Sequence, residues 1–199
     1  MSEQKLWRVP KGRLFSTPIP EETRTYKPVS HKQLATVTLA AIKKAGFTVS
    51  IQEYSSAKDG QVANARYVIN ELSDEEMSLE IGWQNSYDKT LSLKFAIGTR
   101  IFICANGCVS GNFGAFKKKH MGTVKDFAPT EIGKAIAGAG AQFKLMREQR
   151  EHMKLIPLTS QNRAELVGRL FLDEKMISST QLNIIRNEIA KPTHDYKSK

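Results

Sequence analysis

The sequence predicts an α+β fold in which an N-terminal helix precedes an antiparallel β-meander of about six strands, and C-terminal helices follow. Three observations predict this order. Apolar residues recur at helical spacing between positions 30 and 46, alternate with polar residues from 47 to 111, and return to helical spacing after 128. With 199 residues, 40% of them hydrophobic, the chain can bury one core, with or without a small appendage.

The first 29 residues are interpreted as a proline-rich arm. It holds four of the seven prolines: Pro10, Pro18, Pro20 and Pro28. Because proline fixes φ and removes a backbone donor, we expect no regular element of useful length here. Trp7, Leu14 and Phe15 need a surface on which to pack. That surface is the arm's own domain or a neighbouring subunit, and the favoured hypothesis is the neighbouring subunit, since an exchanged arm links identical chains.

Helix signals bracket the sheet. Ser30 with Gln33 fits a capping box, and the same pattern recurs at Ser178 with Gln181. Between them, a long helix is expected to open at Pro129. The chain therefore divides into an arm, a helix-plus-sheet core, a helical region and a tail, at residues 1–29, 30–126, 127–193 and 194–199.

Alternation of apolar and polar residues predicts the strands. Alternation over 47–52, 63–69, 77–83 and 91–97 predicts four strands that each have one buried and one wet face. Two further strands are expected at 100–104 and 108–111. Turns are expected at Asp59-Gly60 and Asn106-Gly107. Segment 100–104 is the most continuously apolar, so we expect it to be a separate central strand.

Positive charge is concentrated late in the predicted sheet. The chain carries a formal +10, and residues 89–125 contain seven Lys or Arg and no Asp or Glu. Aromatic rings lie between these cations, a mixture suited to a polyanion whose bases can stack. The alternative is a solvated basic face with no ligand. The candidate nucleic-acid contacts are Tyr87, Lys89, Lys94, Arg100, Phe116, Lys117, Lys118, Lys119, His120, Lys125, Lys144 and Arg147.

These candidates are expected to form one stripe. Lys94 falls on the wet face of its strand, and the triple lysine at 117–119 is expected on a loop after the last hairpin. Lys144 and Arg147 are three residues apart on the long helix and are hypothesised to line a wall of the same groove. Their spacing to Glu148 and Glu151 is also compatible with simple surface ion pairs.

The sequence contains no catalytic or cofactor motif. It has no phosphate-binding loop and no dinucleotide fingerprint, and its four histidines are far apart. Cys104 and Cys108 are expected to be reduced and structural. Acidic residues 74–76 are interpreted as a turn between strands rather than a metal site. We therefore predict no cofactor, no metal and no enzymatic activity.

One segment resembles a known family. It runs from Asn85-Ser86-Tyr87-Asp88-Lys89-Thr90 through an apolar strand to Arg100-Ile101-Phe102-Ile103-Cys104-Ala105-Asn106-Gly107. It is similar to the central signature of a phage/plasmid-like family of unknown function, which implies a mobile-element origin. The predicted outline also resembles single-strand annealing proteins of the Rad52 and Red-beta type, at the level of fold only.

These observations favour a phage or plasmid DNA-metabolism protein that binds nucleic acid without sequence preference. Single-stranded DNA is the favoured ligand, annealing or recombination the favoured role, and a homo-oligomer the expected state. The chain has no apolar run long enough for a membrane span and no secretory signal core, so we expect a cytoplasmic location in a bacterial host cell. The alternatives are a phage protein that binds a host or defence protein and, third, a metal-dependent nuclease.

Overall fold

The computed structural model of the chain describes residues 7–101, 108–122 and 124–193. It divides into two compact units, which we describe separately. The described residues up to Lys144 form the first unit, and those from Leu145 onward form the second. The architecture is α+β, as the sequence predicts. Within the described residues, no helix combines the length and apolar character that crossing a membrane requires.

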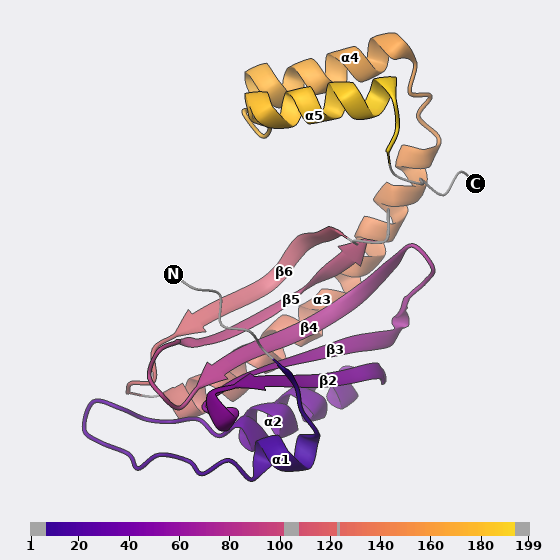
Figure 1. Ribbon diagram of the computed structural model, residues 1–199. Helices are drawn as coiled ribbons and strands as arrows, with labels where there is room; N and C mark the ends of the chain where they lie inside the picture. The colour runs from indigo at the N-terminus through magenta and orange to yellow at the C-terminus, as the bar shows by residue number, and fades with distance from the viewer. Residues whose placement is uncertain (1–6, 102–107, 123, 194–199) are drawn as a thin grey trace. The chain divides into compact units, whose positions relative to one another are not determined.

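The first unit is built on a six-stranded antiparallel sheet (Figure 1). The strands follow one another in chain order, so each pairs with its sequence neighbours. Their bounds are Trp7–Arg8 (β1), Val49–Ala57 (β2), Val62–Ser73 (β3), Met77–Ser86 (β4), Leu93–Ile101 (β5) and Cys108–Lys118 (β6). The predicted meander is confirmed, although its six strands are not the six expected.

The separate central strand predicted at 100–104 is wrong for its described part. Arg100 and Ile101 are the last residues of β5, which continues through Gly98 without a break. The pairing of β5 with β6 shifts register on both sides of Gly98, which is a β-bulge rather than a strand end. The sixth strand is instead β1, a short segment of the arm that pairs with β2. The predicted turn at Asn106-Gly107 lies outside the described residues.

Helices flank the sheet in sequence. The first unit contains α1 (Lys11–Phe15), α2 (His31–Lys44), the short turn η1 (Lys58–Gly60) and the first part of α3 (Val124–Lys154); the second contains the end of α3, then α4 (Ser160–Gly168), η2 (Arg169–Asp173) and α5 (Ser179–Ala190). Capping is largely as predicted. The side chain of Ser30 accepts from the amide of Gln33, and Ser178 with Gln181 forms the full capping box. Helix α3 begins at Val124, before Pro129, which lies inside it.

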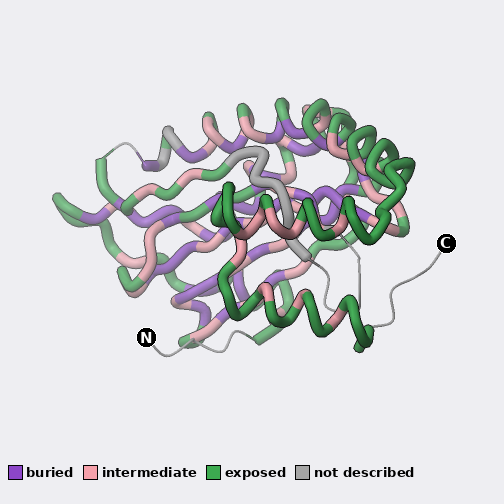
Figure 2. The backbone as a smooth tube through the Cα atoms, turned by 90° about the horizontal axis from the view of Figure 1, so that it is seen from above, coloured by how far each residue is buried: buried purple, intermediate pink, exposed green. Residues whose placement is uncertain are grey.

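Helices α2 and α3 cover one face of the sheet, and the core lies between them and the strands (Figures 1 and 2). Fully buried side chains alternate along each central strand, for example Tyr67, Leu79, Phe95 and Ile97. Helix α3 contributes the buried stripe Val124, Ala128, Ile132, Ile136, Ala139 and Phe143. Gly140 allows close approach, because a Cβ there would lie 2.9 Å from the ring of Phe47.

The described part of the arm packs on its own sheet, which corrects the hypothesis that it lies on a neighbouring subunit. The amide of Val9 donates to the carbonyl of Tyr54 at 3.0 Å, and Leu14, Tyr26 and Val29 are buried. The arm also contains two short elements, β1 and α1, in a segment where we expected no regular element of useful length. Both elements are too short for a sequence pattern to reveal, and both rest on tertiary contacts, β1 with β2 and α1 with α2 and β2.

Candidate nucleic-acid interface

Two exposed lysines lie directly opposite each other on the uncovered face of the sheet. In the register of β5 with β6, Lys94 pairs with Lys117, and both side chains are exposed. Their neighbours in β5, Leu93 and Phe95, point into the core and are buried. Lys119 follows β6 and is also exposed. We call Lys94, Lys117 and Lys119 the basic edge.

Among the described residues, no acidic side chain pairs with any lysine of the basic edge. Like charges directly opposite each other on neighbouring strands are destabilising. The basic edge is therefore an unfavourable arrangement in the free protein, and a bound anion would relieve it.

Small residues form the floor beside the basic edge. Gly82, Ala96 and Ala115 are consecutive register partners across β4, β5 and β6, on the same face as Lys94. Ala96 and Ala115 are exposed, and Gly98 follows on β5. Small side chains in a strand allow another backbone to approach the sheet closely. These small residues, which we call the small-residue floor, thus form a strip of low side chains bordered by cations.

Polar residues extend this surface across the sheet. The register row that contains Lys94 and Lys117 crosses all six strands, and its other members are Arg8, Ser55, Asn64 and Gln84. None of these four residues is among the contacts that the sequence predicts. Asn64 lies in a predicted strand, whereas Arg8, Ser55 and Gln84 lie outside the predicted segments. The alignment of one strand with the next also depends on register, which a single sequence does not show.

A chain of ion pairs occupies the uncovered face toward β2. Arg66 binds Glu80 through two nitrogens at 2.7 and 2.5 Å and reaches Glu53 at 3.1 Å. Arg8 also pairs with Glu53, and the Arg100 guanidinium lies 3.8 Å from Glu80. The predicted contact Arg100 is therefore on the correct face, but it belongs to this neutralised network rather than to the basic edge.

Tyr87 does not offer a ring to a ligand, contrary to the prediction. It is only 4% exposed, and its ring stacks on His31 at a centroid distance of 3.9 Å. Its hydroxyl accepts from the His31 amide at 2.8 Å. Asn85 donates to the Val29 carbonyl at 2.7 Å and lies 2.9 Å from Nδ1 of His31. Tyr87 thus belongs to a buried network that fastens the start of α2 to the sheet.

Phe116 and Lys118 lie on the covered side of β6. Phe116 is the register partner of buried Phe95, and the two rings stack at 5.4 Å. Lys118 pairs with buried Leu93, so alternation places it opposite to Lys117. The triple lysine therefore does not act as one group. Lys117 and Lys118 also belong to β6 rather than to a loop.

His120 and Lys89 are also engaged elsewhere. His120 is buried beside Tyr26, with ring centroids 5.7 Å apart, and burial lowers the pKa of its imidazole. The Lys89 ammonium lies 4.8 Å from the centroid of the Tyr26 ring, within the range of a cation–π interaction. Neither residue borders the small-residue floor.

Of the three helical candidates, one, Lys144, is placed away from this surface. Lys125 falls in the first turn of α3, and its side chain lies outside what the structure describes. Lys144 is exposed on α3, the helix that packs against the opposite face of the sheet from Lys94. Arg147 belongs to the second unit, so its place in the groove stays a prediction. The predicted groove wall at Lys144 is therefore wrong.

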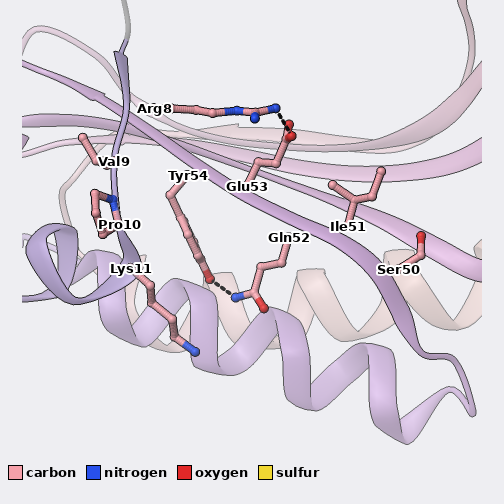
Figure 3. A pocket seen from close by; sticks show the side chains of 9 residues that line it. All are labelled: Arg8, Val9, Pro10, Lys11, Ser50, Ile51, Gln52, Glu53 and Tyr54. Atoms are coloured by element: carbon pink, nitrogen blue, oxygen red, sulfur yellow. Dashed lines mark hydrogen bonds and ion pairs between the residues drawn. The ribbon is translucent and has the colours of Figure 1, made fainter.

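A hollow of about 680 Å³ lies beside β1 (Figure 3). Its charged and polar side chains are already engaged with neighbours: Arg8 with Glu53, Gln52 with Tyr54, and Lys11 over the Phe15 ring at 5.6 Å. None of the predicted contacts lines it. We therefore assign no site there.

The acidic segment 74–76 is a turn, as predicted. A carboxylate oxygen of Asp74 accepts from the amides of Glu76 and Met77, each at 2.9 Å, and closes the β3–β4 connection. In the part of the chain that the structure describes, no three His, Cys, Asp or Glu side chains gather in a way that could hold a metal ion. Cys104 lies outside the described residues, so the state of the two cysteines stays a prediction.

The chain belongs to an uncharacterised family. Residues 22–198 match the family described as Domain of unknown function (DUF932). No curated protein and no solved structure matches the chain. The match covers strands β2 to β6, α2 and the C-terminal helices, and it assigns neither a mobile-element origin nor an annealing fold.

Proposed function

We propose that this protein binds nucleic acid, without catalysis, on the uncovered face of β4, β5 and β6. The basic edge contacts the phosphates, and Gly82, Ala96 and Ala115 let the ligand backbone approach the sheet. The observation that carries the proposal is the register pair Lys94–Lys117, two exposed cations that no described acid neutralises. A polyanion removes their repulsion and releases counterions when it binds.

Protection of a sheet edge does not account for both lysines. Lysine on an edge strand discourages pairing with other chains, and Lys117 lies on the edge strand β6. Lys94 lies on β5, which is paired on both sides. A lysine on an interior strand does not block edge pairing, so Lys94 needs another explanation, and phosphate contact supplies one.

The proposal concerns the phosphate backbone rather than base stacking. Tyr87 and Phe95 are buried, and Phe116 lies on the covered side. These three rings are therefore not part of the proposed surface, and the side chains of Phe102 and Phe113, the other rings among the cations, lie outside what the structure describes. Single-stranded DNA, duplex DNA and RNA are compared in one titration series, and mixing complementary strands in the same series tests the proposed annealing role.

The test is the salt dependence of binding to a fluorescent oligonucleotide. The variant Lys94→Ala/Lys117→Ala/Lys119→Ala is expected to flatten the slope of log affinity against log salt by about 2–3, because each phosphate contact contributes about 0.7–0.9. The matched control is Lys32→Ala/Lys43→Ala/Lys44→Ala, which removes the same charge from exposed positions of α2. The control is expected to retain the slope.

Equal slopes for the two triple variants would contradict the proposed interface. Binding by neither the intact chain nor the control, with circular dichroism showing an intact fold, would contradict nucleic-acid binding itself. That outcome would favour the alternative partner, a protein with an acidic surface. Binding of such a partner would also depend on the basic edge. Another acidic protein would compete for that binding, whereas an oligonucleotide would not.

A further inference from the structure

The second unit has no buried residue among positions 145–193. In Figure 2 the tube of α4 and α5 shows only exposed and intermediate residues. Large apolar side chains are nevertheless frequent there. Those classed as exposed are Leu145, Met153, Leu155, Ile156, Leu158, Leu166, Leu172, Met176, Ile184 and Ile189. In the first unit, by contrast, the described exposed examples are Trp7, Ile19, Ile51 and Met121.

The helices themselves are well specified despite this exposure. Thr159 caps α4 by accepting from the Asn162 amide at 3.1 Å, and α5 begins with a capping box. Arg169 pairs with Glu165 one turn earlier, at 2.7 Å. Local signals therefore favour helix, but short helices gain most of their stability from packing an apolar face. A unit of this size rarely supplies such a core alone and commonly gains it by oligomerisation.

We propose that the exposed apolar surface of the second unit is a self-association surface, covered by the same surface of a second copy of this chain. The area is sufficient. At roughly 100 Å² for each of the ten side chains, one copy offers about 1,000 Å², whereas a standard interface buries about 800 Å² per partner. Isologous pairing brings the same patch of both copies together, so one apolar surface covers the other.

The charge of this unit fits a copy of itself. Residues 145–193 hold eight basic and six acidic residues, a formal +2, and the two signs are interspersed. Residues 1–144 hold 20 basic and 13 acidic residues, a formal +7. Two near-neutral surfaces approach without strong repulsion. An anionic membrane would instead select a strongly basic amphipathic helix, which this unit does not provide.

Sedimentation of the full chain without nucleic acid tests this inference. Its mass is expected to rise from monomer to dimer with concentration. Met176→Glu/Ile184→Glu places charge on two side chains that are 68% and 61% exposed, and it should raise the dissociation constant at least about tenfold without altering the helix content. The control Ile19→Glu/Ile51→Glu changes exposed apolar residues of the first unit and should associate like the intact chain.

An intact chain that remains a monomer at every concentration would overturn the inference. Equal association of the two double variants would overturn it as well, because it would place the contact elsewhere. The result is separable from nucleic-acid binding, since Met176 and Ile184 lie outside the basic edge. Both double variants are expected to bind a short oligonucleotide as the intact chain does.

Discussion

The two faces of the sheet are built from the same strands and are used differently. On the covered face, several polar groups are paired with one another inside an apolar core. Examples are the Trp83 indole, which donates to the Tyr67 hydroxyl at 3.2 Å, and His31 with Asn85. On the uncovered face, the ion pairs end at β5 and leave the basic edge without acids. The comparison shows that one strand can hold a core residue and a binding residue next to each other.

Substitutions at two adjacent residues of β5 are expected to show the largest difference in stability between the two faces. Phe95 is 1% exposed, and Phe95→Ala should lower the free energy of unfolding by about 3–5 kcal/mol, because it leaves a cavity beside Phe116. Lys94→Ala, one residue away, should change it by no more than about 0.5 kcal/mol, and toward greater stability, because it removes the repulsion from Lys117. Urea unfolding measures both, and equal losses would mean that the two faces are not distinct.

A smaller loss of stability is expected when acid protonates a buried histidine of the covered face. Burial lowers the pKa of His31 to about 4, so the folded protein keeps the ring neutral where an unfolded chain would protonate it. The free energy of unfolding is therefore highest above the unfolded pKa of about 6.5, and it decreases as the pH falls toward the pKa of the folded protein. By about pH 4.5, the loss is about 2–3 kcal/mol.

His31→Gln separates this contribution from the rest. At pH 7 the variant is expected to have a lower free energy of unfolding than the intact chain. Between pH 7 and 4.5 its free energy of unfolding should fall much less than that of the intact chain, as measured by urea unfolding. Some decrease should remain, because burial also lowers the pKa of His120. An unchanged pH dependence in the variant would show that His31 is not held neutral by the fold.

Much of the fold could be predicted from the sequence, because local patterns specify it. The helix between Ser30 and Gly46, the turn at Asp59-Gly60 and the capping box at Ser178 all appear where expected. The failures depend on tertiary contacts. The short strand β1 exists only because β2 pairs with it, and the bulge at Gly98 joins two predicted strands into one.

The candidate site was harder to predict for the same reason. Lys94, Lys117 and Lys119 were identified by charge, and the alternation of β6 would have separated Lys117 from Lys118 once the strand was known to reach residue 118. Nothing in the sequence indicated that Tyr87 stacks on His31, which precedes it by 56 residues. Charge density can locate a surface, but only register decides which side chains share it.

Lysine footprinting tests the central claim most directly. The full chain is acetylated with and without a saturating oligonucleotide, and mass spectrometry compares the reactivity of individual lysines. Lys94, Lys117 and Lys119 are expected to be protected by the ligand, whereas Lys32, Lys43 and Lys44 on the covered side should react equally in both samples. Protection of the α2 lysines with none at the basic edge would contradict the assignment of the uncovered face as the binding surface.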